Sequence, residues 1–140
     1  MIVIDDQLLL AVLSDTSPGD IAAAVAAGEV FTTGSWYYRL GRAVTAGTGS
    51  LSGRFQALDG SVREQVLASL EFLPDQIGLL SLRVVVPVMQ VLAVTRPLNF
   101  LNAEALGAAL LLDASLAVTV DAPLLRRGAE DLSVTYRLVD

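Results

Sequence analysis

The 140-residue sequence contains no cysteine, no histidine and no lysine. The absence of cysteine excludes disulfide scaffolds, thiol catalysis and cysteine-based zinc sites. The absence of histidine excludes Ser-His-Asp triads and imidazole general bases. All nine basic residues are arginines. Any chemistry at a site in this chain must therefore come from carboxylates, hydroxyls, amides, arginines or the backbone.

Positive charge and long hydrophobic runs are also scarce. The 15 acidic residues outnumber the nine basic ones, and the net charge of -6 opposes nonspecific attraction to nucleic acid. The most apolar run, residues 84–94, is much shorter than the roughly 20 residues that cross a bilayer. The N-terminus has acids at Asp5 and Asp6 and lacks the basic segment of a secretory signal. We therefore expect a cytoplasmic protein with no membrane association.

Apolar residues, in contrast, are abundant. They make up 54% of the sequence, which is above the usual share of about 45–50%. Such a chain can bury a full core and still leave apolar surface, and twofold homodimers are the commonest way to cover that surface. We expect one domain over residues 1–140 and a homodimer.

Short apolar runs that predict strands alternate with longer segments that predict helices. The predicted strands span residues 2–4, 30–32, 77–81, 116–120 and 134–139. The predicted helices span residues 7–13, 18–28, 35–46, 61–72, 83–95, 101–112 or 102–112, and 122–128. Pro87 is expected in the first turn of the segment 83–95, whose consecutive valines would equally suit a strand. The glycine-rich residues 45–53 predict a flexible loop. This alternation predicts an α/β fold of three layers, α/β/α, around a mostly parallel sheet.

Three carboxylates are placed where such a sheet binds ligands. Asp5 and Asp121 each follow a predicted strand, so both are expected at the carboxyl edge of the sheet. Glu104 lies in the predicted first turn of the helix that precedes the second of these strands. Converging carboxylates repel one another, and a bound Mg²⁺ or Mn²⁺ would remove that repulsion. Such a metal would activate water and polarise a phosphoryl group, which is hydrolytic nuclease chemistry.

Each acid also has a purely structural interpretation. Asp5 or Asp6 could cap the first helix, and Asp121 could cap the last one. Glu104 would interact favourably with the dipole of its own helix if it lies in the first turn. The sequence does not decide between these structural roles and a metal site.

The two ends of the chain resemble the PIN domains, the metal-dependent ribonuclease fold of many bacterial toxin and RNA-processing proteins. The opening VIDDQLLLAVL is similar to the family's strand, acid and apolar helix. The segment AEALGAALLLDASLAVTVDAPLL is similar to its closing pattern. The resemblance implies a PIN-like fold with Asp5, Glu104 and Asp121 as the first, third and fourth acidic positions, and Thr119 as the accompanying hydroxyl. It also implies Mg²⁺ or Mn²⁺ as cofactor, and an RNA or protein partner such as an antitoxin.

The family's second acidic position is missing from this sequence. No acidic residue occurs between Glu29 and Asp59, and the position falls on Tyr37, Tyr38 or Arg39. Gln7 also stands where the family prefers asparagine or serine.

Arginines on the same predicted helix offer a replacement for the missing acid. Arg39 or Arg42 could turn toward Asp5, Glu104 or Asp121 and neutralise the acids without metal. The alternative is that both arginines face solvent.

Two functions are therefore open. The first is a PIN-like protein that is weak or silent as a nuclease and acts as a homodimeric binding or regulatory module. The alternative is a toxin-type, Mg²⁺- or Mn²⁺-dependent endoribonuclease that uses Asp5, Glu104 and Asp121 as metal ligands and catalytic residues.

Overall fold

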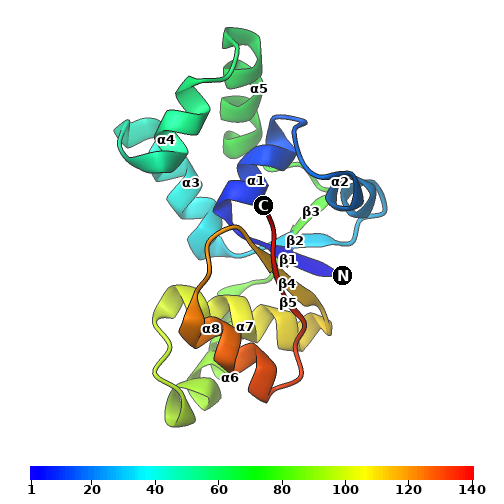
Figure 1. The fold of residues 1–140 in the computed structure, drawn as a ribbon, viewed down its shortest axis with the longest axis vertical. Coiled ribbons are helices and arrows are strands. Elements are labelled where there is room, and N and C mark those ends of the chain that lie inside the picture. The colour runs from blue at the N-terminus through cyan, green and yellow to red at the C-terminus, as the bar shows by residue number, and fades with distance from the viewer.

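Five short parallel strands form one sheet at the centre of the computed structural model, which describes residues 1–140 (Figure 1). The strands are β1 (Ile2–Ile4), β2 (Val30–Thr32), β3 (Ile77–Leu79), β4 (Ser115–Val118) and β5 (Tyr136–Leu138). Their order in the sheet is β3-β2-β1-β4-β5, and every neighbouring pair is parallel. The predicted α/β fold with a parallel sheet is thus confirmed. The strand order reverses between β1 and β4, which is where open parallel sheets bind ligands.

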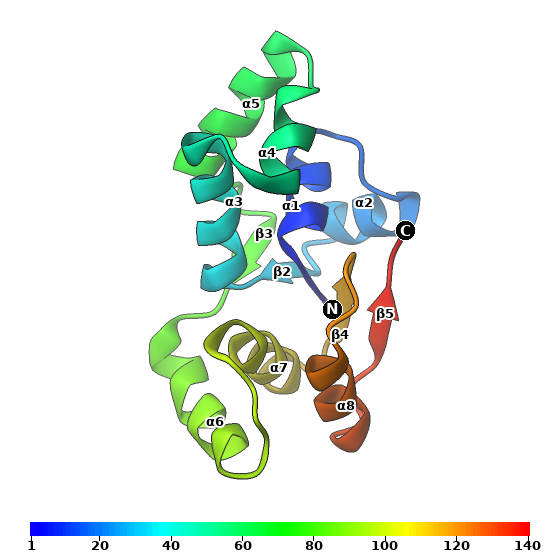
Figure 2. The same cartoon turned by 60° about the vertical axis from the view of Figure 1, so that its left-hand side comes forward.

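Helices cover both faces of this sheet. They are α1 (Asp6–Leu13), α2 (Gly19–Ala26), α3 (Gly34–Ala46), α4 (Gly49–Gln56), α5 (Gly60–Glu71), α6 (Leu82–Thr95), α7 (Phe100–Leu112) and α8 (Pro123–Asp131). Helices α1 to α5 lie on one side and α6 to α8 on the other (Figure 2). In β1, Val3 packs into the core beneath α7 and α8, and Ile4 into the core beneath α1 to α5. A strand buried on both faces explains why its sequence is an unbroken apolar run.

The loop predicted for residues 45–53 is wrong, because most of this segment is helical. Helix α3 continues to Ala46 and ends at Gly47, whose φ of 73° is the left-handed conformation that favours glycine. Helix α4 begins two residues later. Its residues Leu51 and Phe55, one turn apart, are buried in the core beside α1. Burial of these two side chains outweighs the poor helix propensity of the surrounding glycines.

The segment with consecutive valines is helix α6, as predicted, and the strand alternative does not occur. Pro87 lies inside this helix and not in its first turn, so that part of the prediction is wrong. Helix α6 packs on α7, and much of its other side is exposed. No single helix is both long and apolar enough to cross a membrane, and only α6 and α7 taken together, bent by 115°, meet that criterion.

Candidate functional site

A pocket of about 260 Å³ lies beyond the carboxyl ends of β1 and β4. Its charged lining residues are Asp5, Asp6, Arg39 and Asp121, and half of its 14 lining residues are hydrophobic. The pocket is therefore at the edge where the sequence places the acids. Two of the three predicted site residues, Asp5 and Asp121, line it, whereas Glu104 does not.

Asp5 is a buried helix cap whose two carboxylate oxygens both accept hydrogen bonds. Its Oδ1 accepts from the backbone N–H of Leu8 at 2.9 Å, which caps α1. Its Oδ2 accepts from the backbone N–H of Thr119 at 2.6 Å and from the Thr119 hydroxyl at 2.7 Å. The capping interpretation of Asp5 is confirmed. These bonds also tie the end of β4 to the start of α1.

Glu104 is a cap as well, but of a different helix from the one that carries it. It is the fifth residue of α7, outside the predicted first turn, and only 2% of it is exposed. Its Oε1 accepts hydrogen bonds from the Ser35 N–H at 2.9 Å and the Ser35 hydroxyl at 2.5 Å, and its Oε2 accepts from the Gly34 N–H at 3.2 Å. The carboxylate therefore neutralises the N-terminus of α3. The expected interaction with the dipole of its own helix is wrong.

Asp121 is the most exposed of the three acids and lies at the rim of the pocket. Its Oδ1 accepts a hydrogen bond from the Tyr136 hydroxyl at 3.0 Å, and its Oδ2 lies 3.6 Å from Nη2 of Arg126. Burial raises the pKa of Tyr136, and the hydrogen bond to Asp121 adds to that increase. The residue in the N-cap position of α8 is Ala122, so the prediction that Asp121 caps this helix is wrong.

Asp6 also lines the pocket, which the sequence did not predict. It is 6% exposed, and its Oδ1 accepts from the Gln7 N–H at 2.9 Å. Its Oδ2 is buried without a hydrogen-bond partner, and Nε of Arg39 lies 3.4 Å away. Burial raises the pKa of Asp6, the positive charge of Arg39 opposes the increase, and the negative charge of Asp5 adds to it. Two adjacent acids at the end of a strand were the only sign of this residue in the sequence.

Of the three α3 residues Tyr37, Tyr38 and Arg39, only Arg39 lines the pocket. Tyr38 is 67% exposed, and the Tyr37 hydroxyl donates to the carbonyl oxygen of Leu70. Arg39 pairs with Asp6, and not with any of the three acids proposed for it. Arg42 forms no ion pair with an acidic side chain.

The three acids proposed as metal ligands do not form one cluster in this structure. No group of three or more acidic side chains is placed to hold one metal ion. Both oxygens of Asp5 and both oxygens of Glu104 already accept hydrogen bonds from protein donors. Mg²⁺ requires nearly octahedral oxygen coordination and is usually held by one or two carboxylates with free lone pairs. Asp5 and Glu104 could therefore serve as metal ligands only in competition with the hydrogen bonds that cap α1 and α3.

Comparison of the chain with protein-family models and with curated proteins gave no match.

Proposed function

We propose that this protein is a PIN-like protein that is silent or weak as a ribonuclease and acts as a homodimeric binding or regulatory module. The observation that carries the proposal is the environment of Glu104. In an active nuclease of this type, the Glu104 carboxylate would serve as a metal ligand. Here it is buried and accepts three hydrogen bonds from the first turn of α3. Arg39 in the same pocket also disfavours a metal ion, because a guanidinium repels a cation.

The alternative is a toxin-type endoribonuclease that depends on Mg²⁺ or Mn²⁺ and uses Asp5, Glu104 and Asp121. Two observations favour it: Asp5 and Asp121 line one pocket, and Thr119 donates to Asp5. This alternative requires Glu104 to release the N-terminus of α3 when metal binds.

A combined metal-binding and cleavage experiment separates the two functions. We expect millimolar Mn²⁺ to leave the melting temperature unchanged, because an ion that does not bind the native state cannot stabilise it. We also expect a fluorescently labelled single-stranded RNA to stay intact in the same solution. A rise in melting temperature that Asp121→Asn abolishes, or RNA cleavage that Asp5→Asn abolishes, would contradict the proposal and support the alternative.

The dimer has a candidate surface on the outer side of α6. Val84, Val91 and Val94 are 50%, 70% and 83% exposed, and Pro87 beside them is also exposed. Their spacing places them on one side of the helix. An apolar stripe of this kind can pack against the same stripe of a second copy around a twofold axis.

We expect light scattering to give about twice the monomer mass of 14.7 kDa at micromolar concentration. Replacing both Val91 and Val94 by glutamate should yield the monomer, because like charges then face each other across the axis. Leu67→Glu on α5, at the opposite end of the molecule, is the control and should remain dimeric (Figure 1). A monomeric mass for the unaltered protein would show that the surface does not dimerise.

A further inference from the structure

One of the acids that line the pocket at the sheet edge has a carboxylate oxygen that accepts no hydrogen bond. Asp6 is more than nine-tenths buried, it lines the pocket, and its Oδ2 accepts no hydrogen bond. Buried carboxylate oxygens are normally satisfied, and an unsatisfied one is unfavourable. The oxygens of Asp5 and Glu104 are satisfied, so this atom is the exception among the buried acids.

The remaining lining determines which kind of ligand could supply the missing donor. Three carboxylates and one guanidinium line the pocket, so its charge attracts cations and repels anions. Apolar side chains, including Trp36, Leu101 and Val120, make up half of the 14 lining residues, and the uncharged polar residues Gln7, Ser50 and Asn102 complete the wall. The volume of about 260 Å³ is just below the range of about 300–1,000 Å³ that is usual for drug-sized ligands. A small molecule with one cationic group and a short apolar body matches this charge, lining and size.

We propose that the pocket binds a small organic cation with a primary ammonium group, which donates a hydrogen bond to Oδ2 of Asp6 while its apolar part lies against the hydrophobic wall. The ammonium ion is a compact donor with three N–H groups, so it can bond to a single carboxylate oxygen in several orientations. A divalent metal ion matches the site less well, because no group of three or more acidic side chains is placed to hold one.

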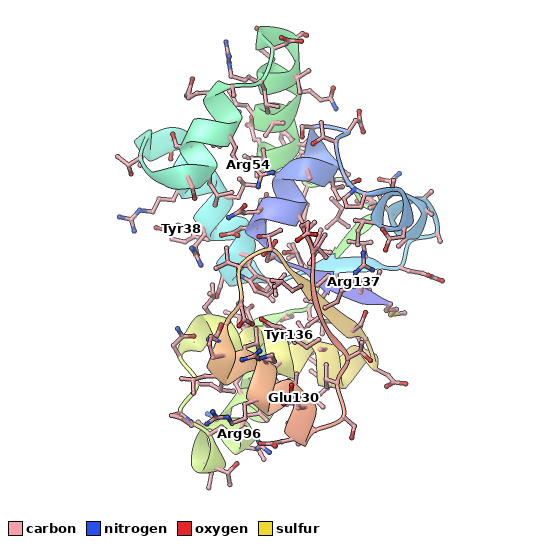
Figure 3. The ribbon with its side chains drawn as sticks, in the orientation of Figure 1. Tyr38, Arg54, Arg96, Glu130, Tyr136 and Arg137 are labelled. Carbon is pink, nitrogen blue, oxygen red and sulfur yellow. The ribbon has the colours of Figure 1, made fainter.

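Binding requires Arg39 to move. Its Nε lies 3.4 Å from Oδ2 of Asp6 but makes no hydrogen bond with it, and the Arg39 side chain is 54% exposed. Asp6 is buried but Arg39 is half exposed, so the arginine can turn into solvent once an ammonium group compensates the Asp6 charge in its place. Arg39 is then a competitor of the ligand, and its removal should tighten binding. Figure 3 labels Tyr38 of α3, the neighbour of Arg39 in the sequence, and Tyr136, whose hydroxyl donates to Asp121.

The inference rests on the proposed function, because it requires a pocket that holds no divalent metal. Failures of the two proposals can be distinguished, because cation binding is measured in EDTA whereas metal binding and cleavage are measured with Mn²⁺. The sole tryptophan of the chain, Trp36, lines the pocket and reports on binding.

The experiment titrates the full chain with n-butylammonium chloride at constant ionic strength and follows the fluorescence and indole N–H resonance of Trp36. We expect a saturable change with n-butylammonium and none with the neutral analogue n-butanol. Asp6→Asn should weaken binding about tenfold, which corresponds to the loss of one charge-assisted hydrogen bond. Arg39→Met should strengthen it several-fold. Asp75→Asn, which removes an exposed acid outside the pocket, is the control and should leave affinity unchanged.

Two results would overturn the inference. One is an equal response to n-butanol and n-butylammonium in the unaltered protein, which would mean that charge does not contribute. The other is an Asp6→Asn variant, shown by circular dichroism to be folded, that binds n-butylammonium as tightly as the unaltered chain.

Discussion

Glu104→Gln should lower the free energy of unfolding by about 3 kcal/mol, a large loss for a substitution that preserves shape. The native carboxylate accepts from the N–H groups of Gly34 and Ser35 and from the Ser35 hydroxyl, and it is 2% exposed. Glutamine replaces one acceptor oxygen with a donor, so at least one N–H of α3 would face another N–H. The negative charge at the N-terminus of α3 is lost as well. Urea denaturation followed by circular dichroism measures the difference.

Asp121→Asn is the matched control for this measurement. Asp121 is a partly exposed acid at the same pocket, and its replacement should change the free energy of unfolding by less than about 0.5 kcal/mol. If the acids formed an empty metal site, each substitution would relieve repulsion between carboxylates and would stabilise the metal-free protein. Stabilisation by Glu104→Gln would therefore refute the capping role.

The strands were the most predictable part of the fold. The observed bounds of β1 and β2, Ile2–Ile4 and Val30–Thr32, equal the predicted ones, because each apolar run ends at polar residues. Helix α4 was not predictable in the same way. Its stability comes from burial of Leu51 and Phe55 against distant parts of the chain, and local propensity argues against it.

The site was predictable only to the level of the sheet edge. A residue that follows a parallel strand must emerge at its carboxyl end, and this placed Asp5 and Asp121 correctly. The partners of a side chain depend on how helices pack. Glu104 meets the N-terminus of α3, 69 residues earlier in the chain, and no local pattern encodes that contact. The sequence also did not determine how α3 is rotated about its own axis, and this rotation directs Arg39 toward Asp6.

The second large effect concerns the pH dependence that Asp6 gives to folding. Burial raises the pKa of Asp6 above 3.8, its value in an unfolded chain, and Arg39 reduces the increase without cancelling it. A carboxyl group with a raised pKa binds its proton more tightly in the native state. Its contribution to stability is therefore fully present below pH 3.8 and is lost as the pH rises through the folded pKa. Burial of Asp6 therefore opposes folding more strongly as the pH rises and the carboxyl group loses its proton.

We therefore expect the stability of the unaltered protein, relative to Asp6→Asn, to increase as the pH falls from 7 toward 4. Each unit by which the folded and unfolded pKa values differ corresponds to about 1.4 kcal/mol. The other carboxylates titrate alike in both proteins wherever the substitution leaves them undisturbed. Their contributions therefore cancel in the difference between the two free energies of unfolding. In an Arg39→Met background the change should begin at higher pH, because the positive charge that lowers the pKa of Asp6 is absent. Urea denaturation at several pH values measures these differences. Parallel stability curves for the unaltered protein and Asp6→Asn would mean that Asp6 has the same pKa folded and unfolded, and that its buried oxygen is hydrated in solution.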